Sequence, residues 1–148
     1  MLQKKKSGIS APVVTVRDIY VFETKIYISM GKGEGKMECI FCKIIRGELP
    51  ANKVFENDEV IAFHDIHPIA PVHVLVIPKK HMTSLLEIEL EDCQLIGEMH
   101  LIMQEIAKKL EIDQTGFRVL TAIGEDGLQS VKHFHYHLVG GRKLEWIM

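Results

Sequence analysis

Three histidines alternate with large apolar residues near the end of the chain, in the stretch HFHYH at residues 133–137. The surrounding sequence, VKHFHYHLVGG, is typical of a β-strand, in which residues two apart point to the same face. We therefore expect one face to carry His133, His135 and His137 and the other to carry Phe134, Tyr136 and Leu138. A row of imidazoles can bind a metal ion, attack an electrophile, transfer protons or lie in water.

Three interpretations of this row remain open. A solvated strand face usually carries Lys, Glu and Thr, so a purely structural role fits poorly. All three imidazoles could hold a catalytic zinc ion with one open position, but same-face residues lie about 7 Å apart along a strand, which strains such a set. In the third interpretation one imidazole attacks, a second handles protons and the last holds structure, since neutral imidazole is a competent nucleophile near pH 7.

The composition is that of one globular domain. The chain has 148 residues, of which 47% are hydrophobic and 26% charged, and these values are ordinary for a soluble protein. The net charge of −2 argues against a nucleic-acid or anionic-membrane surface, and no apolar run approaches the roughly 18 residues of a membrane-spanning helix. Three cysteines without a secretory signal favour a reducing, cytoplasmic location.

Charge divides the chain into two parts. Residues 1–36 carry seven basic and three acidic side chains, whereas all eight histidines follow them. Residues 11–30 have strand-like composition and lead into GKGEGK before Met37. We interpret 1–36 as an N-terminal extension, either an appended hairpin or non-native sequence, because codons for residues 34–36 would resemble a bacterial ribosome-binding site ahead of a start at Met37.

The remainder, 37–148, reads as short strands with two helices. A short helix should end near Gly47 and Pro50, and apolar residues at helical spacing predict a long helix over 89–110. Five strands are predicted: two in 53–66 around an Asn57–Asp58 turn, one buried on both faces at 72–78, one at 117–123 and one at 131–139. Because the strands follow one another closely, we predict an α+β fold with an antiparallel five-stranded sheet.

Taken in order, the motifs resemble the histidine triad (HIT) superfamily of nucleotidyl hydrolases and transferases. HFHYHLV is similar to its signature, and it is accompanied by IFCKIIRGELPA, AFHDI, APVHVLVIPKKH, QSV and GGR. The resemblance covers residues 37–148 and leaves 1–36 outside. The GGRKLEW ending is most similar to the Hint branch, the purine nucleoside phosphoramidases.

In that family the middle triad histidine is the nucleophile, which places this role on His135. It would attack the α-phosphorus of a nucleoside 5′-phosphoramidate, and water would then hydrolyse the nucleotidyl-histidine. The resemblance places His137 beside the α-phosphate, assisting the leaving group. Ser130 and Gln129 match polar contacts to the phosphate and leaving group, although in this sequence alone they read as turn residues.

The resemblance also implies a nucleotide pocket for an AMP-type purine ligand. Asp65, in AFHDI, matches the residue that accepts hydrogen bonds from both ribose hydroxyls. The base-binding residues would be Ile40, Phe41, Ile44, Phe63, His64 and Ile66, which could equally be plain core. His73 matches a residue close to the nucleophile, whereas His67 and His100 are expected at the surface.

Cys39 and Cys42 form a CxxC motif, which alone could be redox-active or two buried thiols. Some family members hold a structural zinc ion with two cysteines and two histidines, and the match adds His81 and His133. Two thiolates and two imidazoles fit a closed tetrahedral site. Cys93 is expected to be a small buried hydrophobe.

Two positions depart from the family pattern. Ala122 stands where an Asn is common, and Leu128 replaces a Gly that lets the backbone approach the phosphate, so its Cβ could constrict the site or alter the backbone angles. These changes put the rate and the leaving-group preference in doubt.

The family implies a homodimer with one continuous sheet, built through the long helix and adjoining strand. Trp146 matches a residue that reaches the partner's active site, although local packing of the tail is an equal alternative. The expected function is hydrolysis of purine nucleoside phosphoramidates. Its rivals are a dinucleoside polyphosphate hydrolase, a zinc-stabilised nucleotide-binding module with little turnover, and a metalloenzyme that uses all three triad histidines.

Overall fold

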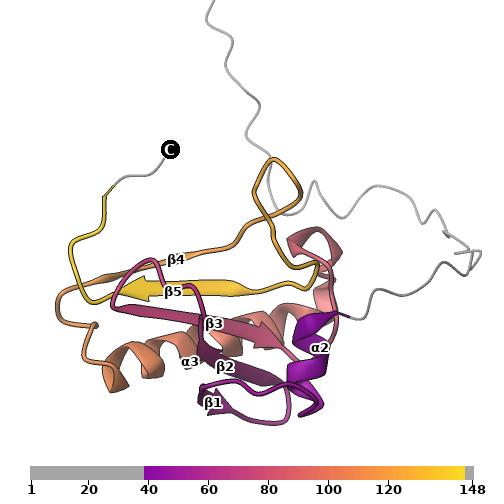
Figure 1. Ribbon diagram of the computed structural model, residues 1–148. Coiled ribbons are helices and arrows are strands. Elements are labelled where there is room, and N and C mark those ends of the chain that lie inside the picture. The colour runs from indigo at the N-terminus through magenta and orange to yellow at the C-terminus, as the bar shows by residue number, and fades with distance from the viewer. Residues whose placement is uncertain (1–38, 146–148) are drawn as a thin grey trace, which may run out of the picture. The chain divides into compact units, whose positions relative to one another are not determined.

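A five-stranded antiparallel sheet with two α-helices forms the domain, which confirms the predicted α+β fold (Figure 1). The computed structural model describes residues 39–145. The N-terminal extension, Met37 and Trp146 lie outside the described residues. Within the described part, no helix is long and apolar enough to cross a lipid bilayer.

The helices are short α2 and long α3, and two 3₁₀ turns precede α3. Their bounds are α2 Ile40–Ile45, η1 Leu85–Glu87, η2 Leu90–Asp92 and α3 Cys93–Lys109. The strands are β1 Lys53–Glu56, β2 Val60–His64, β3 Val72–Pro78, β4 Phe117–Leu120 and β5 Tyr136–Gly140, in the sheet order β1-β2-β3-β5-β4. The triad strand β5 therefore lies between β3 and β4, next to the most buried strand of the sheet.

An Asx turn makes the β1–β2 hairpin at the predicted position. The side-chain oxygen of Asn57 accepts hydrogen bonds from the backbone N–H groups of Glu59 at 3.0 Å and Val60 at 2.7 Å. This local bonding is the reason asparagine favours turns. It fixes the register of the hairpin, in which Glu56 pairs with Ile61 across β1 and β2.

Strand alternation gives the sheet two apolar faces, and Figure 1 shows α3 along one face and α2 at one end of the other. The face packed on α3 carries Val60, Ala62, Val74, Val76, Tyr136 and Leu138. The opposite face, covered at one end by α2, carries Ile61, Phe63, Leu75 and Ile77. β3 is buried on both faces, as its continuous apolar sequence predicts. The triad imidazoles belong to the α2 side, because Phe134, Tyr136 and Leu138 point to α3.

The structure corrects several predicted bounds. α3 begins at Cys93 rather than residue 89 because a 3₁₀ turn takes residues 90–92, and β4 ends at Leu120 rather than 123. β5 begins only at Tyr136, so His133 and His135 precede the strand. The reason is that Phe134 N–H bonds the carbonyl oxygen of Met82, at 2.6 Å, outside the sheet ladder.

The expectation that Cys93 is buried is wrong. It is the first residue of α3 and it is exposed. The apolar face of α3 that packs on the sheet runs instead through Leu95, Met99, Ile102, Met103 and Ile106.

Candidate active site and metal centre

His135 is held in one tautomer by the backbone. Its side chain is 2% exposed, and Nδ1 lies 2.6 Å from the carbonyl oxygen of His133. A carbonyl can only accept, so Nδ1 carries the proton and donates it, and Nε2 keeps its lone pair. Phe41 packs edge-on against the ring, with centroids 5.2 Å apart.

Burial is the main influence on the charge of His135. Loss of hydration lowers the pKa of this imidazole, while the hydrogen bond to His133 and the charge of Asp65 raise it by smaller amounts. The ring is therefore neutral at pH 7. A neutral imidazole with a free Nε2 is the form that can attack an electrophile.

A pair of imidazoles, His73 and His137, lies beside His135 on the same face of the sheet. Ile69 N–H donates to Nδ1 of His73 at 3.3 Å, so His73 carries its proton on Nε2. That nitrogen lies 2.9 Å from Nδ1 of His137 and 3.5 Å from Oδ2 of Asp65. His137 therefore accepts at Nδ1 and has Nε2–H left to donate. Burial, followed by the neighbouring imidazoles, lowers the pKa of His137 to about 4.

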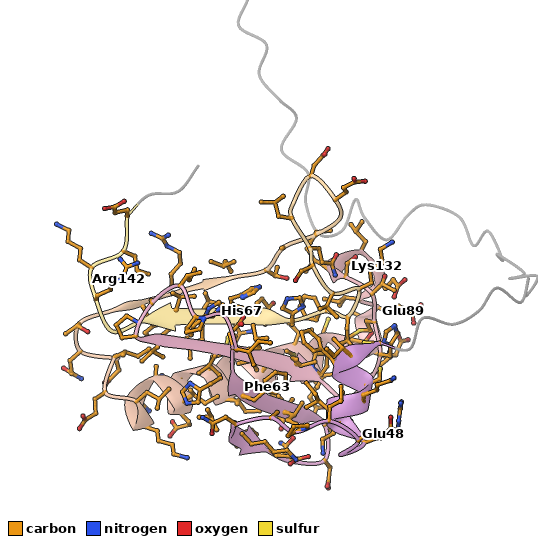
Figure 2. The ribbon with its side chains drawn as sticks, in the orientation of Figure 1. Glu48, Phe63, His67, Glu89, Lys132 and Arg142 are labelled. Carbon is orange, nitrogen blue, oxygen red and sulfur yellow. The ribbon has the colours of Figure 1, made fainter. Side chains whose placement is uncertain are left out.

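A small hollow of about 290 Å³ opens beside Asp65 at the end of β2. It brings together five of the predicted nucleotide-binding residues, with Pro50, Ala51 and Asn52 completing the wall: Ile44, Phe63, His64, Asp65 and Ile66. The backbone N–H of His67 donates to Oδ1 of Asp65 at 2.8 Å, which fixes the carboxylate at the rim. Figure 2 shows Phe63 and His67 on this part of the domain.

Other predicted pocket residues lie differently. Ile66 is 83% exposed and Ile40 47% exposed, so neither is a core residue, and Ile40 is not among the residues that line the hollow. Phe41 is buried and contacts Phe63 and the triad rather than the hollow. His67 and His100 are exposed, as expected.

Two cysteines and two histidines converge at the start of α2. His133 Nδ1 lies 3.4 Å from Cys39 Sγ, 3.6 Å from Cys42 Sγ and 3.2 Å from His81 Nδ1. Cys42 Sγ lies 3.2 Å from His81 Nδ1. Ligands of a tetrahedral zinc ion are separated by roughly 3.3–3.8 Å, as follows from bonds of about 2.0–2.3 Å. These four residues therefore fit a structural zinc ion.

The tautomer of His133 also suits a metal ligand. Its Nε2 donates to the carbonyl oxygen of Pro78 at 2.8 Å, which leaves Nδ1 unprotonated and facing the cysteines. Burial lowers the pKa of this imidazole to about 4. The three triad imidazoles do not converge on one point, since His133 faces the cysteines and His137 faces His73.

Comparison with known proteins agrees with this arrangement. The family model described as "Scavenger mRNA decapping enzyme C-term binding" matches residues 38–145. A HIT-like protein of Buchnera aphidicola is 44% identical over 108 residues, which are 73% of this chain and 96% of the relative. The chain belongs to the histidine triad superfamily.

Two further relatives of this HIT domain carry informative names. A "14 kDa zinc-binding protein" of Brassica juncea is 41% identical over 111 residues, covering 74% of this chain and 97% of the relative. The solved structure of a HIT family hydrolase from Clostridium thermocellum is 41% identical, with a TM-score of 0.73, and covers 76% of this chain and 97% of its own.

The loop before the triad is braced by Gln129 in this HIT domain. Its Oε1 accepts from Gly124 N–H at 3.0 Å, and its Nε2 donates to the carbonyl oxygens of Thr83 at 2.6 Å and Val131 at 3.0 Å. Both N–H donors of the amide are thus used in holding the backbone. Ser130, the next residue, is exposed, and Ala122 is partly buried.

Leu128 takes the conformation expected for the glycine it replaces. Its φ is 58°, in the left-handed region, and its side chain is 85% exposed. The side chain extends into solvent, so it does not constrict the site. Replacing glycine by Leu128 therefore strains the backbone but does not reduce the space in the site.

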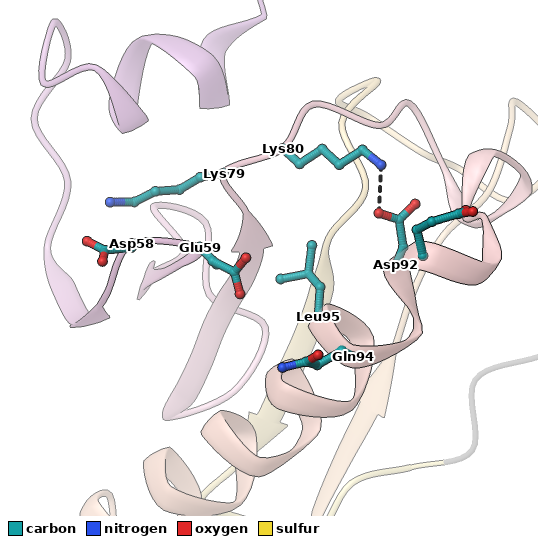
Figure 3. Close-up of a pocket in the computed structure, with 8 residues that line it drawn as sticks. Asp58, Glu59, Lys79, Lys80, Asp92, Gln94 and Leu95 are labelled. Carbon is teal, nitrogen blue, oxygen red and sulfur yellow. Dashed lines mark hydrogen bonds and ion pairs between the residues drawn. The ribbon is translucent and has the colours of Figure 1, made fainter.

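Residues outside the sequence-based prediction support the metal centre. A hollow of about 370 Å³ separates the β2 turn from the start of α3, and Figure 3 shows Lys80 reaching across it to Asp92. This ion pair is 2.6 Å long, and Asp92 also accepts from Glu89 N–H at 3.1 Å. Lys80 precedes His81, so the pair ties the His81 segment to α3. The sequence did not predict the Lys80–Asp92 contact, because no motif connects these two charged residues.

A third hollow, of about 650 Å³, lies on the other side of His137 from Asp65. Its floor includes Leu120 and Val139, and Ile69 and Arg142 contribute to its walls. Leu120 pairs with His137 across β4 and β5 and so shares its sheet face. The triad is thus flanked by two spaces, one near Asp65 and one over β4.

Proposed function

We propose that this HIT domain hydrolyses the P–N bond of purine nucleoside 5′-phosphoramidates through a nucleotidyl-histidine at His135. The observation that supports it best is the 2.6 Å hydrogen bond from Nδ1 of His135 to the carbonyl oxygen of His133. It fixes the tautomer with a free Nε2 in a buried ring beside Asp65 and His137. Such an imidazole is prepared to attack phosphorus.

The proposed reaction has two displacements. In the first, Nε2 of His135 bonds to the α-phosphorus, the P–N bond breaks, and the leaving amine takes the proton from Nε2 of His137. In the second, water attacks the phosphorus, its proton returns to His137, and the P–N bond to His135 breaks to release the nucleotide. His73 holds His137 in the proton-donating tautomer through the 2.9 Å contact. Ser130 lies next to the triad and is assigned to the phosphate.

Nucleoside recognition is assigned to the hollow beside Asp65. A carboxylate can accept hydrogen bonds from both hydroxyls of a ribose, and Oδ2 of Asp65 is not the atom bonded to the His67 backbone. Ile44 and Phe63 supply apolar walls on which a purine can pack. Ile66, exposed at the rim, would cover the base when it is bound.

We assign a structural zinc ion to Cys39, Cys42, His81 and His133. When bound, zinc would supply no chemistry and would join α2, the segment after β3 and the triad in one closed site. Its link to catalysis is His133, whose side chain belongs to the metal set and whose carbonyl oxygen orients His135.

Intact mass spectrometry after brief exposure to an AMP amide tests the covalent step. Wild type should gain one adenylyl group and release AMP, whereas His135→Ala should do neither. His100→Ala, on the exposed side of α3, is the matched control and should behave as wild type. An adduct that persists in His135→Ala contradicts the assignment of the nucleophile.

A nucleotide-binding module with little turnover is the second candidate. The observation that favours it is the amide of Gln129, whose donors and acceptor are all occupied by backbone groups rather than facing a phosphate. Binding of AMP to wild type and to His135→Ala, without adduct or turnover in either, would select this function.

The family description also makes phosphoanhydrides worth comparing, because it refers to mRNA decapping. Release of AMP from an AMP amide and from diadenosine polyphosphates, at equal concentration, separates the two substrate classes. A preference for the amide supports the proposal, and a preference for the polyphosphates selects the dinucleoside polyphosphate hydrolase.

We further propose a cytoplasmic homodimer that begins functionally at residue 37. Exposed apolar side chains on edge strand β4 and on α3 support a dimer face: Phe117, Val119 and Leu101. Light scattering of the purified protein tests the dimer, and peptides from residues 1–36 in the native host would contradict the start at Met37.

A further inference from the structure

A second group of metal-binding atoms lies inside the candidate active site. Nε2 of His73 is 2.9 Å from Nδ1 of His137 and 3.5 Å from Oδ2 of Asp65. The ligand atoms of these three residues all lie within 4.8 Å of one another. None of the three belongs to the cysteine-containing set.

These separations suit a metal ion as well as a hydrogen bond. Neighbouring ligands of an octahedral or tetrahedral ion lie roughly 2.8–3.6 Å apart, given bonds of about 2.0–2.2 Å. Two imidazoles and one carboxylate are a set that binds divalent transition metals and leaves coordination positions open. We propose that Asp65, His73 and His137 bind a second divalent transition-metal ion, of the zinc and cobalt class, in competition with the nucleoside.

The scaffold presents these ligands with little rearrangement. Asp65 follows β2, His73 lies on β3 and His137 on β5, which are neighbouring strands. The backbone N–H of Asp65 donates to the carbonyl oxygen of His73 at 2.9 Å and fixes the two residues relative to each other. His73 is 5% exposed, so its rotamer is held by packing.

Metal binding requires one change of tautomer. The proton on Nε2 of His73 must move to Nδ1, which breaks the bond from Ile69 N–H. That bond is 3.3 Å long, at the weak end of the range for N–H···N contacts. The metal then takes the place of the proton between His73 and His137. The carboxylate of Asp65 offsets part of the positive charge of the metal.

The consequence for function rests on the proposed nucleotide site. Asp65 is assigned to the ribose, and its Oδ2 cannot serve the ribose and a metal at the same time. A bound ion would therefore exclude the nucleoside. Metal availability would regulate the enzyme at its own active site.

Cobalt distinguishes the two sites by their ligand atoms. Zinc-loaded protein, with the cysteine-containing site filled, is titrated with Co²⁺ and followed by calorimetry and visible absorption. One further equivalent of Co²⁺ should bind, and its visible spectrum should show the d–d bands of cobalt with nitrogen and oxygen ligands. Thiolate-to-cobalt charge-transfer bands should be absent, because they would report zinc displaced from Cys39 and Cys42.

His73→Asn should weaken this second equivalent at least about tenfold, since even outer-shell changes cost that much. Zinc content at the cysteine-containing site should stay unchanged, and His100→Asn, which removes an exposed histidine, should bind as wild type. Should His73→Asn fail to fold, Asp65→Asn, at a partly exposed position, carries the same expectation. The proposal is overturned if wild type binds no further Co²⁺, or if both variants bind the further Co²⁺ as tightly as wild type. Thiolate-to-cobalt bands on binding would overturn it as well.

Adenosine tests the competition without a phosphate that would itself chelate cobalt. At ten times its own Kd it should raise the apparent Kd for Co²⁺ about tenfold. Adenosine that binds without changing the cobalt affinity overturns the competition. A chain that takes up cobalt as described but binds no adenosine contradicts the nucleotide site instead, so the two failures are distinguishable.

Discussion

The carbonyl oxygen of His133 accepts a 2.6 Å hydrogen bond from Nδ1 of His135, while the side chain of His133 lies among Cys39, Cys42 and His81. One residue therefore links the proposed metal centre to the proposed nucleophile. A movement of the His133 backbone would alter the hydrogen bond that orients His135. Stability of the metal centre and competence of the nucleophile should accordingly change together.

Loss of a cysteine ligand should lower both stability and turnover. Cys42→Ser is expected to release zinc and to reduce the free energy of unfolding by at least about 3 kcal/mol, since structural zinc contributes directly to folding. Zinc content by mass spectrometry and a urea titration measure the two effects. Cys93→Ser is the matched control, because this thiol is exposed and outside the set. Equal zinc content in both variants would contradict the assignment.

The unfolding free energy should fall on acidification through the buried imidazoles. Burial lowers the pKa of His137 to about 4, whereas the unfolded chain has a histidine pKa of about 6.5. Between these values the unfolded state binds a proton that the folded state does not, so stability is present above pH 6.5 and is lost toward pH 4. The expected slope is about 1.4 kcal/mol per pH unit for this histidine.

His137→Asn isolates this contribution. Urea titrations between pH 4.5 and 6.5, with one equivalent of zinc for the cysteine-containing site, should show a slope smaller by about 1.4 kcal/mol per pH unit than in wild type. His133 is a proposed zinc ligand and is left unchanged. A slope equal to that of wild type would mean that His137 is protonated in the folded protein.

Leu128→Gly should stabilise the domain. A left-handed conformation at a residue with a Cβ costs roughly 1–2 kcal/mol, and the φ of 58° at Leu128 is in that region. Glycine removes the strain but adds freedom to the unfolded chain, so the net gain is about 0.5–1 kcal/mol. Leu128→Ala keeps a Cβ and serves as the control, with no gain expected. A stabilised alanine variant would show that the side chain, not the backbone, is the source.

Asp65→Asn should remove selectivity for the ribose. An amide can accept at only one of its two atoms, so we expect affinity for AMP to fall by about 1–3 kcal/mol and affinity for the 2′,3′-dideoxy analogue to change little. Calorimetric titration of both ligands measures the difference. Asp58→Asn, which lies at the other hollow, is the control. Equal losses for both ligands would assign Asp65 to the fold rather than to the sugar.

Sequence by itself determined the order of the elements and the two faces of β5. The alternation of Phe134, Tyr136 and Leu138 with the histidines is enough to separate a core face from a site face, because a strand repeats every two residues. The CxxC motif and the AFHDI segment likewise identified residues that the fold brings to the site. These patterns are local in the sequence, so they can be recognised without knowing which residues become neighbours in the fold.

Only the tertiary structure decided the backbone partners and their consequences. The contacts from Pro78 and His133 carbonyls, and from Ile69 N–H, involve groups that every residue has, so no residue type indicates them. The same holds for the late start of β5, where Met82 takes the N–H of Phe134, and for Gln129, whose amide bonds three backbone groups. Tautomers and converging ligands depend on distances between strands, and those distances exist only once the chain is folded.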